Sequence, residues 1–508
     1  MICKSARNWM AVNARIVFAM VIGVALTSVA TAEKQPASQS GTLPLTTKSA
    51  EARHLVEIAW ELDLDEVEQE QAADILRKAV QLDPDFAMAH QLLAETSLDP
   101  AEQVKEQRKA FATKQFASPA EQLVIGWWQD VSDHKLISAI TRMNDLLGQY
   151  PRDHWVVFLS TFWLTTQTQY ERAVTIYERS GITDSPGLMN NTAYDYAYMH
   201  QFEPAYALMD KYVAALPGDA NPEDSYAEIL RMAGKFDKAV EHYRAALQIN
   251  PQFYSSEFGI ADTYSLMGDQ PRARKEYDIA FKKFPLPELH EVQWRTREAM
   301  TYVREADFKG ADRAFQTIAD YARRKHMSQV EADTYRQMAM YQTNPKQALV
   351  LLAMADAAIK NGSNAMQAAL QQEEAQVLRA RVELEIRMGE KVAAHRALNR
   401  LAKMTSNSSD RLIEVAYQGA AGALLFSEKK YDDAISHLEE DVNNPLSLKL
   451  LTAAYQEKGF GAEAKHAGDR LASINDPSLE QALVVPAFRK CYEDPNCSGN
   501  VKPVSMKK

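Results

Sequence analysis

Gly234 to Pro251 reads GKFDKAVEHYRAALQINP, and Gly268 to Pro285 reads GDQPRARKEYDIAFKKFP. The two stretches start 34 residues apart, and each glycine is followed at the same offsets by alanine, tyrosine and alanine. Residues three and four apart share one face of a helix, so this small–large–small stripe predicts close packing against a partner helix. Glycine tolerates positive φ and ends the preceding helix in a tight turn. We interpret each stretch as the second half of a helical hairpin.

A ladder of prolines carries this spacing through the N-terminal half of the chain. Successive prolines are 31 to 35 residues apart, and a fixed period of this length is typical of stacked helical repeats. Proline has no N–H and its ring clashes with the preceding turn, so each one is expected where a helix stops. The ladder consists of Pro84, Pro119, Pro151, Pro186, Pro217, Pro251 and Pro285.

This pattern resembles the tetratricopeptide repeat (TPR) family. The resemblance is good over residues 186–285 and fair over 60–185. It implies an all-α fold, a tetratricopeptide-type solenoid of helical hairpins wound into a right-handed superhelix. We expect repeats of this type over 50–300.

The period weakens after Pro285, although the composition stays rich in helix-forming residues. We interpret 301–480 as degenerate helical repeats with longer or irregular pairs. The alternative is a separate all-α domain over this part of the chain.

The N-terminus has the pattern of an export signal. Three basic residues precede and enter an apolar run, and Ala30-Thr31-Ala32 supplies the small residues that a signal peptidase requires. We expect 1–32 to be a signal peptide cleaved after Ala32, which places the protein in the periplasm or outside the cell. The alternative is an uncleaved anchor. Residues 33–49, rich in Gln, Pro, Ser and Thr, are predicted to be a flexible leader.

The charge balance argues against nucleic acid as a partner. The full chain has a net charge of −11, and removal of three cations with the signal peptide makes it more negative still. Phosphates are repelled by such a surface. No segment after the signal is apolar enough to cross a membrane, so no transmembrane segment is expected in the mature chain.

Two cysteines are left after processing, in the C-terminal tail 481–508. Cys491 and Cys497 flank a short segment that contains Asp494-Pro495-Asn496, which favours a turn. In an exported protein this spacing predicts a small disulfide loop. The alternative is two free thiols.

The sequence contains no constellation typical of an enzyme. It has no HExxH, no GxSxG and no glycine-rich phosphate loop, and its eleven histidines are scattered. We therefore expect a non-enzymatic protein without a cofactor or a bound metal.

In the TPR family the first helix of each hairpin lines an inner groove that binds ligands. Carried over to this chain by its 34-residue period, the resemblance implies a groove of aromatic rings beside carboxylates, which favours a peptide or protein partner with a basic or apolar segment. The alternative is that these side chains only pack hairpins together. The groove residues are Asn190, Tyr194, Tyr198, Asp224, Glu228, Arg231, Phe258 and Asp262.

Two functions follow from these observations. The first is a non-catalytic protein–protein interaction scaffold of the bacterial cell envelope, with the partner in the concave groove. The alternative is an accessory protein that binds glycans or small ligands through an aromatic-lined groove. The aromatic residues that suggest it are Trp127, Trp128, Trp155, Phe162 and Trp163.

Overall fold

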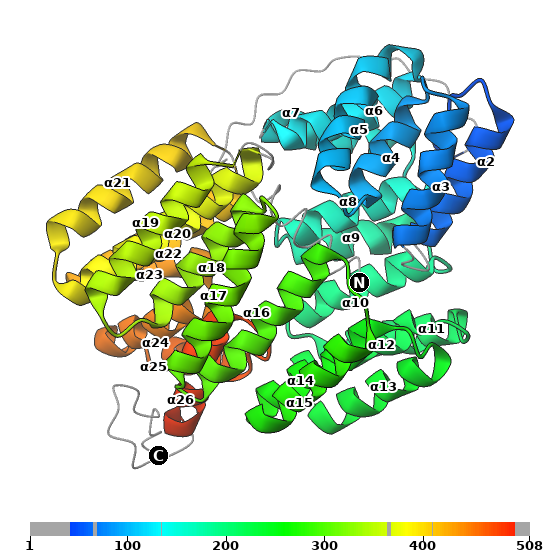
Figure 1. Ribbon diagram of the computed structural model, residues 1–508. Coiled ribbons are helices and arrows are strands. Elements are labelled where there is room, and N and C mark those ends of the chain that lie inside the picture. The colour runs from blue at the N-terminus through cyan, green and yellow to red at the C-terminus, as the bar shows by residue number, and fades with distance from the viewer. Residues whose placement is uncertain (1–40, 64–68, 134, 363–366, 409, 493–508) are drawn as a thin grey trace.

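The computed structural model describes residues 41–63, 69–133, 135–362, 367–408 and 410–492. Within these ranges the regular structure is helical and contains no β-strand. Helices α2 to α25 form twelve consecutive hairpins, and the last helix, α26, follows them (Figure 1). The predicted all-α solenoid of helical hairpins is thereby confirmed.

The first six hairpins, together with the seventh, cover the part of the chain in which the proline ladder is regular. Most of their helices have 12 to 14 residues. The pairs are α2 (Ala50–Glu61) with α3 (Gln69–Leu82), α4 (Ala87–Thr96) with α5 (Pro100–Thr113), α6 (Pro119–Ser132) with α7 (Leu136–Gln149), α8 (His154–Thr166) with α9 (Tyr170–Ser180), α10 (Pro186–Tyr198) with α11 (Phe202–Ala215), and α12 (Asn221–Met232) with α13 (Phe236–Ile249).

About half of the helices in the last six hairpins are longer, and α20 has 22 residues. They are α14 (Tyr254–Met267) with α15 (Gln270–Lys283), α16 (Glu288–Arg304) with α17 (Phe308–Arg324), α18 (Ser328–Tyr341) with α19 (Pro345–Lys360), α20 (Gln367–Met388) with α21 (Lys391–Asn407), α22 (Arg411–Ser427) with α23 (Tyr431–Leu438), and α24 (Pro445–Lys458) with α25 (Gly461–Ala472). Helix α26 spans Leu479–Tyr492.

Packing of consecutive hairpins continues across residue 300, where the period in the sequence weakens. Helices α15 and α16 are in contact, as are α17 and α18, and α19 and α20. The period blurs because α16, α17, α20, α21 and α22 have 17 to 22 residues, so the same kind of hairpin uses more of the chain.

The two helices of a hairpin differ in burial, which defines an inner and an outer layer. In α14 eleven of 14 residues are buried, whereas in α15 only four of 14 are. The same contrast holds for α12 against α13. We call the layer of first helices the inner face, and this is the face that the sequence assigned to a partner.

The small–large–small stripe predicted from the sequence forms the contact between the inner and outer layers of helices. Ala239, Tyr243 and Ala246 are fully buried on α13. Gly259 of the next hairpin faces this stripe, and a Cβ atom there would lie only 2.4 Å from the Tyr243 ring. The repeated small and large positions therefore build the core.

The turn within a hairpin keeps its backbone shape even where glycine is missing. Gly234 and Gly268 have φ values of +75° and +95°, in the left-handed region. His200 and Ala306 occupy the equivalent turns of the neighbouring hairpins with φ of +58° each. The backbone repeat thus extends further than the glycine signature.

The ladder prolines lie between hairpins, but not all of them end a helix. Pro84, Pro217 and Pro251 follow the last helical residue closely, as predicted. Pro119 and Pro186 instead occupy the first turn of α6 and α10, directly after the N-cap serines Ser118 and Ser185. Proline is tolerated there because the first N–H groups of a helix have no intrahelical partner.

Candidate functional site

The eight groove residues predicted from the sequence lie on three neighbouring inner helices, α10, α12 and α14. Seven of the eight are buried, and Tyr198 is half-buried. Asp224 and Glu228 are only 3% and 5% exposed. We expected an open strip, and the structure instead shows these side chains bonded to one another. Whether they bind a partner stays a prediction.

A continuous polar ladder links the inner helices. We use this name for Tyr194, Glu228, Arg231, Asp262 and Arg297. The Tyr194 hydroxyl donates to Glu228 Oε2 at 2.7 Å, and Arg231 donates to Glu228 Oε1 at 3.0 Å and to Asp262 Oδ2 at 3.3 Å. Arg297 of α16 donates to the same Asp262 oxygen. The ladder therefore ties four successive hairpins together.

Three other predicted groove residues are not part of the polar ladder, and their surroundings differ from one another. Asp224 accepts a hydrogen bond of 2.7 Å from the Ser256 hydroxyl. Phe258 is fully buried and stacks on Trp294 with ring centroids 4.7 Å apart. Asn190 is 9% exposed, and its Oδ1 has no hydrogen-bond partner among the described residues.

Burial controls the ionisation of groups around the ladder. It raises the pKa of Tyr277, and the negative charge of Asp262 raises it further. It lowers the pKa of Arg304 to about 10, because a charged guanidinium is poorly solvated there. The negative charge of Asp262 acts to raise the pKa of Arg304 as well, so the same carboxylate influences both groups.

The loop between α25 and α26 covers one end of this region. Asn475 donates from Nδ2 to the Met232 carbonyl oxygen at 3.1 Å, at the C-terminal end of α12. Arg489 of α26 fixes the loop, because it donates to Asn475 Oδ1 at 2.6 Å and to the Ala472 carbonyl oxygen at 2.6 Å. Helix α26 itself packs against α16, α24 and α25. The C-terminal end of the described chain thus lies against the inner helices.

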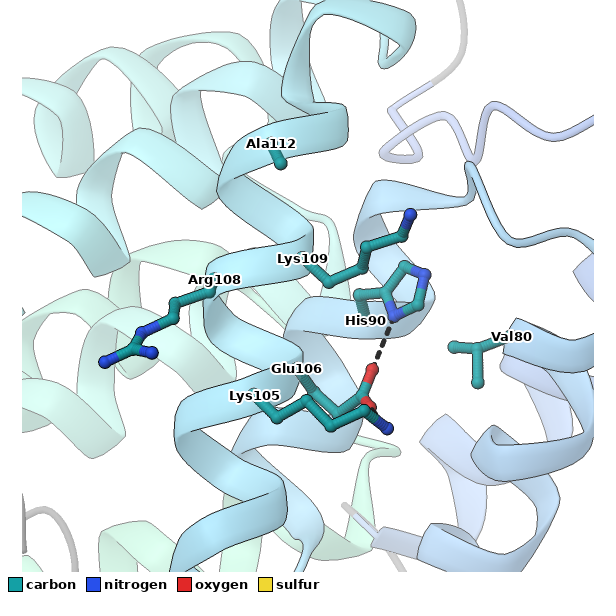
Figure 2. A pocket seen from close by; sticks show the side chains of 7 residues that line it. All are labelled: Val80, His90, Lys105, Glu106, Arg108, Lys109 and Ala112. Carbon is teal, nitrogen blue, oxygen red and sulfur yellow. Dashed lines mark hydrogen bonds and ion pairs between the residues drawn. The ribbon is translucent and has the colours of Figure 1, made fainter. Parts of the chain in front are cut away.

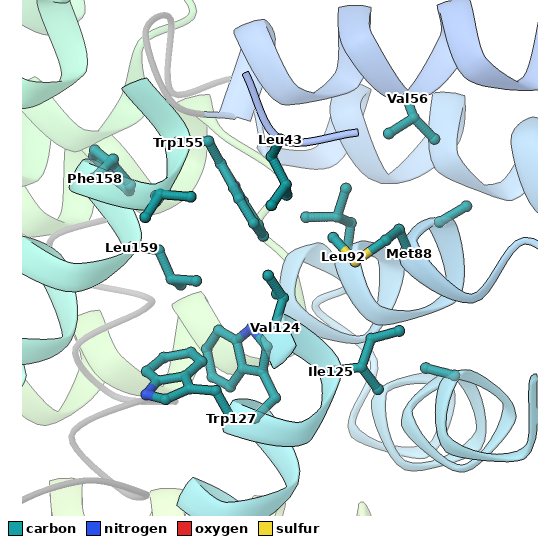
Figure 3. Close-up of a cluster of buried hydrophobic side chains, with 14 of the residues drawn as sticks. Leu43, Val56, Met88, Leu92, Val124, Ile125, Trp127, Trp155, Phe158 and Leu159 are labelled. Atoms are coloured by element: carbon teal, nitrogen blue, oxygen red, sulfur yellow. The ribbon is translucent and has the colours of Figure 1, made fainter. Parts of the chain in front are cut away.

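The inner helices of the first hairpins pack together through buried aromatic side chains. Trp127 packs edge-on against Trp128 and Trp163, with ring centroids 4.5 Å and 5.5 Å apart. Trp155 meets Trp60 of α2 in the same way at 4.1 Å. Figure 3 shows how Trp127 and Trp155 lie among aliphatic side chains from several helices.

The aromatic residues proposed for glycan binding belong to this core. Trp127, Trp128, Trp155, Phe162 and Trp163 are between 0% and 6% exposed. A sugar stacks on an accessible ring face, and these rings have none open to solvent. The interpretation of these five residues as a glycan platform is therefore wrong.

Residues 41–49 lie as an extended segment across the N-terminal ends of the inner helices. Leu43 is buried and Leu45 and Thr47 are partly buried, whereas the residues between them are exposed. This alternation is that of an extended strand. We expected 33–49 to be a solvated leader. Its first part, 33–40, lies outside the described residues, and its second part is held by side chains of three hairpins.

Three carboxylates hold this segment, which we call the leader strand. The Leu43 amide donates to Asp153 Oδ2 at 2.7 Å, the Thr46 amide to Glu121 Oε1 at 2.8 Å and the Lys48 amide to Asp83 Oδ2 at 2.9 Å. Burial acts to raise the pKa of Asp83, but bonds from Thr47 and the amides of Lys48 and Asp85 outweigh it and hold the pKa below its usual value.

Sequence reasoning missed these carboxylates, although two of the three had a local signature. Ser118 and Glu121 form a capping box at the start of α6, and Asp153 is the N-cap of α8. Helix capping explains the hydrogen bond accepted by one carboxylate oxygen of each of these side chains. The second oxygen contacts a segment 35 to 110 residues away, and no local pattern indicates that.

A surface hollow of about 510 Å³ lies between α3 and α5 in the first hairpins (Figure 2). Lys105, Arg108 and Lys109 line it beside a buried pair in which His90 Nδ1 lies 2.6 Å from Glu106 Oε2. The lining contains no serine, threonine or cysteine that this histidine could activate as a nucleophile.

Other expectations concern metals, membranes and the tail. The described residues contain no cluster of three or more His, Cys, Asp or Glu side chains able to hold a metal ion. Among them no helix combines the length and the apolar character needed to span a bilayer. Cys497 and the signal region 1–32 lie outside the described residues, so the disulfide with Cys491 and the cleavage after Ala32 stay predictions.

The protein is a solenoid of helical hairpins, and the first helices of the hairpins form its buried inner layer. Residues 225–253, which cover most of α12 and all of α13 and so nearly the whole of one hairpin, match the family model described as tetratricopeptide repeat. This match falls within the stretch where the stripe and the proline ladder are regular, and it supports the predicted resemblance to the tetratricopeptide repeat (TPR) family.

Similar solved structures include several TPR proteins. One is a tetratricopeptide repeat protein from Parabacteroides merdae, with 13% identity, 61% of this chain and 100% of that chain covered, and a TM-score of 0.34. The Cut9–Hcn1 hetero-tetramer of APC/C shows 14% identity, coverage of 79% and 76%, and a TM-score of 0.35. YrrB, a TPR protein with an unusual peptide-binding site, shows 14% identity, coverage of 41% and 92%, and a TM-score of 0.23. Comparison with curated protein sequences gave no match.

Proposed function

We propose that this protein is a non-catalytic scaffold of the bacterial cell envelope that holds a peptide or protein partner along the inner face of its superhelix. TPR repeats are typical of protein-interaction scaffolds. The observation that carries the proposal is the leader strand, because the solenoid holds an extended polypeptide segment by its backbone amides. The placement in the envelope rests on the signal-like N-terminus.

The partner should be peptide-like and not acidic. The leader strand is neutral to basic, with Leu43, Thr47 and Lys48 as its contact residues, and it meets three carboxylates. Backbone N–H groups and cationic side chains are the natural donors to such acceptors. A glycan is disfavoured, because the aromatic rings that would stack on it are buried in the core.

Photo-crosslinking in living cells tests this proposal. A photoreactive amino acid at Tyr198, which is half-buried on the inner helix α10, should give a discrete adduct with a partner. The same amino acid at Ile137, which is 83% exposed on the outer helix α7, is the control and should not. Mass spectrometry identifies the partner. Adducts from Ile137 alone would place the contact on the outer layer and contradict the proposal.

Cell fractionation checks the envelope assignment separately. The protein should fractionate with periplasmic markers and have its mature N-terminus at Glu33, by Edman or mass-spectrometric analysis. Recovery from the cytoplasm with residues 1–32 intact would contradict it.

A further inference from the structure

We infer that Asp83, Glu121 and Asp153 form a peptide-binding track that takes an extended, non-acidic segment of a partner protein, and that the leader strand occupies this track in cis. The inference rests on the proposed function and names the site and the chemistry of its ligand.

In each of the three carboxylates the two oxygens accept hydrogen bonds from different parts of the chain. One oxygen of Asp153 accepts the Val156 amide and caps α8, while the other accepts the Leu43 amide. Glu121 accepts the Ser118 amide with Oε2 and the Thr46 amide with Oε1. One oxygen therefore belongs to the hairpin, and the other points to the bound strand.

The third carboxylate follows the same rule. Asp83 Oδ1 accepts the Asp85 amide at 3.2 Å, and Oδ2 accepts the Lys48 amide and the Thr47 hydroxyl. All three side chains are at most 6% exposed. A buried carboxylate oxygen without a donor is strongly unfavourable, so the outward oxygens require N–H or O–H groups from whatever segment lies on the track.

The spacing of the track fits an extended chain. Packed helices are about 8–10 Å apart, and an extended chain advances about 3.3 Å per residue, so it crosses a hairpin every two to three residues. The donating amides belong to Leu43, Thr46 and Lys48, which are separated by three and two residues, and they meet three successive hairpins. Recognition of this kind is directed at the backbone and does not depend on one protein sequence.

Side chains add a modest preference. Leu43 is 7% exposed and packs beside Trp155 (Figure 3). The Thr47 hydroxyl lies 2.6 Å from Asp83 Oδ2, and Lys48 Nζ lies 3.3 Å from Asp85. The favoured ligand thus has leucine, then a hydroxyl residue four positions later and a cation next to it. An acidic residue near the track would be repelled.

A synthetic peptide tests the track in trans. The probe is an acetylated, fluorescently labelled peptide of residues 41–49, and the proteins are the mature chain and a variant that lacks 33–48. By fluorescence anisotropy the peptide should bind the truncated variant, whose track is empty, and bind the mature chain at least about tenfold more weakly. Absence of binding to a truncated variant that keeps its helical circular dichroism would overturn the inference.

Two further variants test whether the peptide binds specifically at the track or nonspecifically to the protein. Asp153→Asn in the truncated chain keeps a capping oxygen for α8 but turns an NH₂ group toward the ligand, and should weaken peptide binding about tenfold or more. Asp99→Asn is the matched control, because Asp99 caps α5 and accepts only the Ala101 amide there. A peptide with Thr46→Pro lacks one donor and should bind more weakly as well. If the Asp153→Asn variant binds the peptide as tightly as the Asp99→Asn control does, and the Thr46→Pro peptide binds as tightly as the unaltered peptide, the inference is overturned.

A measurement on the full chain covers the case in which the truncated variant does not fold. In the mature chain, hydrogen exchange of the Thr46 and Lys48 amides should be slowed, and Leu43→Ala should speed it at both positions while α12 to α16 stay protected. Rapid exchange of these amides in the unaltered chain would overturn the inference. Because these experiments use purified components, their failure leaves the crosslinking test of the proposed function intact.

Discussion

The first four hairpins and the next four use the same helical skeleton but fill their inner faces differently. In α2 to α9 the inner helices pack through buried tryptophan and aliphatic side chains, and buried carboxylates at the helix starts hold the leader strand. In α10 to α17 the inner face carries the polar ladder, in which carboxylates pair with arginines of the same layer. The difference lies in what the carboxylates bind.

This contrast shows how one repeat can serve recognition in one region and internal cohesion in another. A carboxylate beside an arginine of the next hairpin is satisfied within the fold and has little capacity left for a ligand. A carboxylate with one oxygen in a helix cap and one toward a separate chain segment depends on that segment. By this criterion the first hairpins are the better candidate for a peptide site, although the sequence pointed to the middle ones.

The largest effect is expected where the polar ladder is broken. Asp262→Ala leaves Arg231 and Arg297 buried without their shared carboxylate, and loss of one partner of a buried ion pair costs about 3–5 kcal/mol. Urea denaturation followed by circular dichroism measures the loss. Asp278→Ala, which removes an exposed carboxylate paired with Lys282, is the control and should cost well under about 1 kcal/mol. Equal losses would mean that the ladder adds no cohesion.

Acid should weaken the middle hairpins through His290. Burial lowers the pKa of His290 from 6.5 to about 4, so the folded state binds fewer protons than the unfolded state between these values. Stability from this group is complete above pH 6.5 and is lost as the pH falls toward 4, by about 2 kcal/mol at pH 5. Unfolding free energies at pH 7.5 and pH 5 measure it. His290→Gln should remove this part of the pH dependence, and an unchanged pH profile in that variant would contradict the assignment.

Overpacking should affect both regions alike, because they share the skeleton. Ala139 on α7 and Ala239 on α13 are both fully buried at equivalent stripe positions. Ala139→Trp and Ala239→Trp should each cost about 1–3 kcal/mol or more, since the ring has no room between the helices. Thermal melts of the two variants test this. A variant with unchanged stability would show that its helix contact is not close.

Release of the C-terminal loop should have a smaller, local effect. Asn475→Ala removes the hydrogen bond to the Met232 carbonyl oxygen and costs about 1 kcal/mol. Hydrogen exchange should quicken at the end of α12 and leave the leader strand unchanged. If hydrogen exchange also quickens at the leader-strand amides, the two ends of the chain are coupled. The leader strand and the middle hairpins would then not be independent regions.

The smallest effect is a gain in stability at a turn. Ala306 has φ of +58°, which favours glycine, so Ala306→Gly should stabilise the protein by about 0.5–1 kcal/mol. Gly234→Ala, at φ of +75°, is the mirror experiment and should destabilise it. Thermal denaturation compares the two variants. A loss of stability in Ala306→Gly would contradict the common turn geometry.

The sequence by itself determined the repeat. The stripe of Ala239, Tyr243 and Ala246, the turn glycines and the proline ladder are local signals with fixed spacing, and they were enough to predict helical hairpins that stack. They also placed Tyr194, Glu228 and Asp262 on one face of neighbouring helices, because that follows from the period alone.

Only the tertiary structure decided what this face contacts. Arg297 reaches Asp262 from 35 residues away, the Leu43 amide reaches Asp153 across 110 residues, and Asn475 reaches Met232 across 243. Such contacts depend on how the superhelix brings distant segments together, and no local spacing encodes them. For that reason the sequence predicted the layer of inner helices and could not predict which distant segments of the chain contact it.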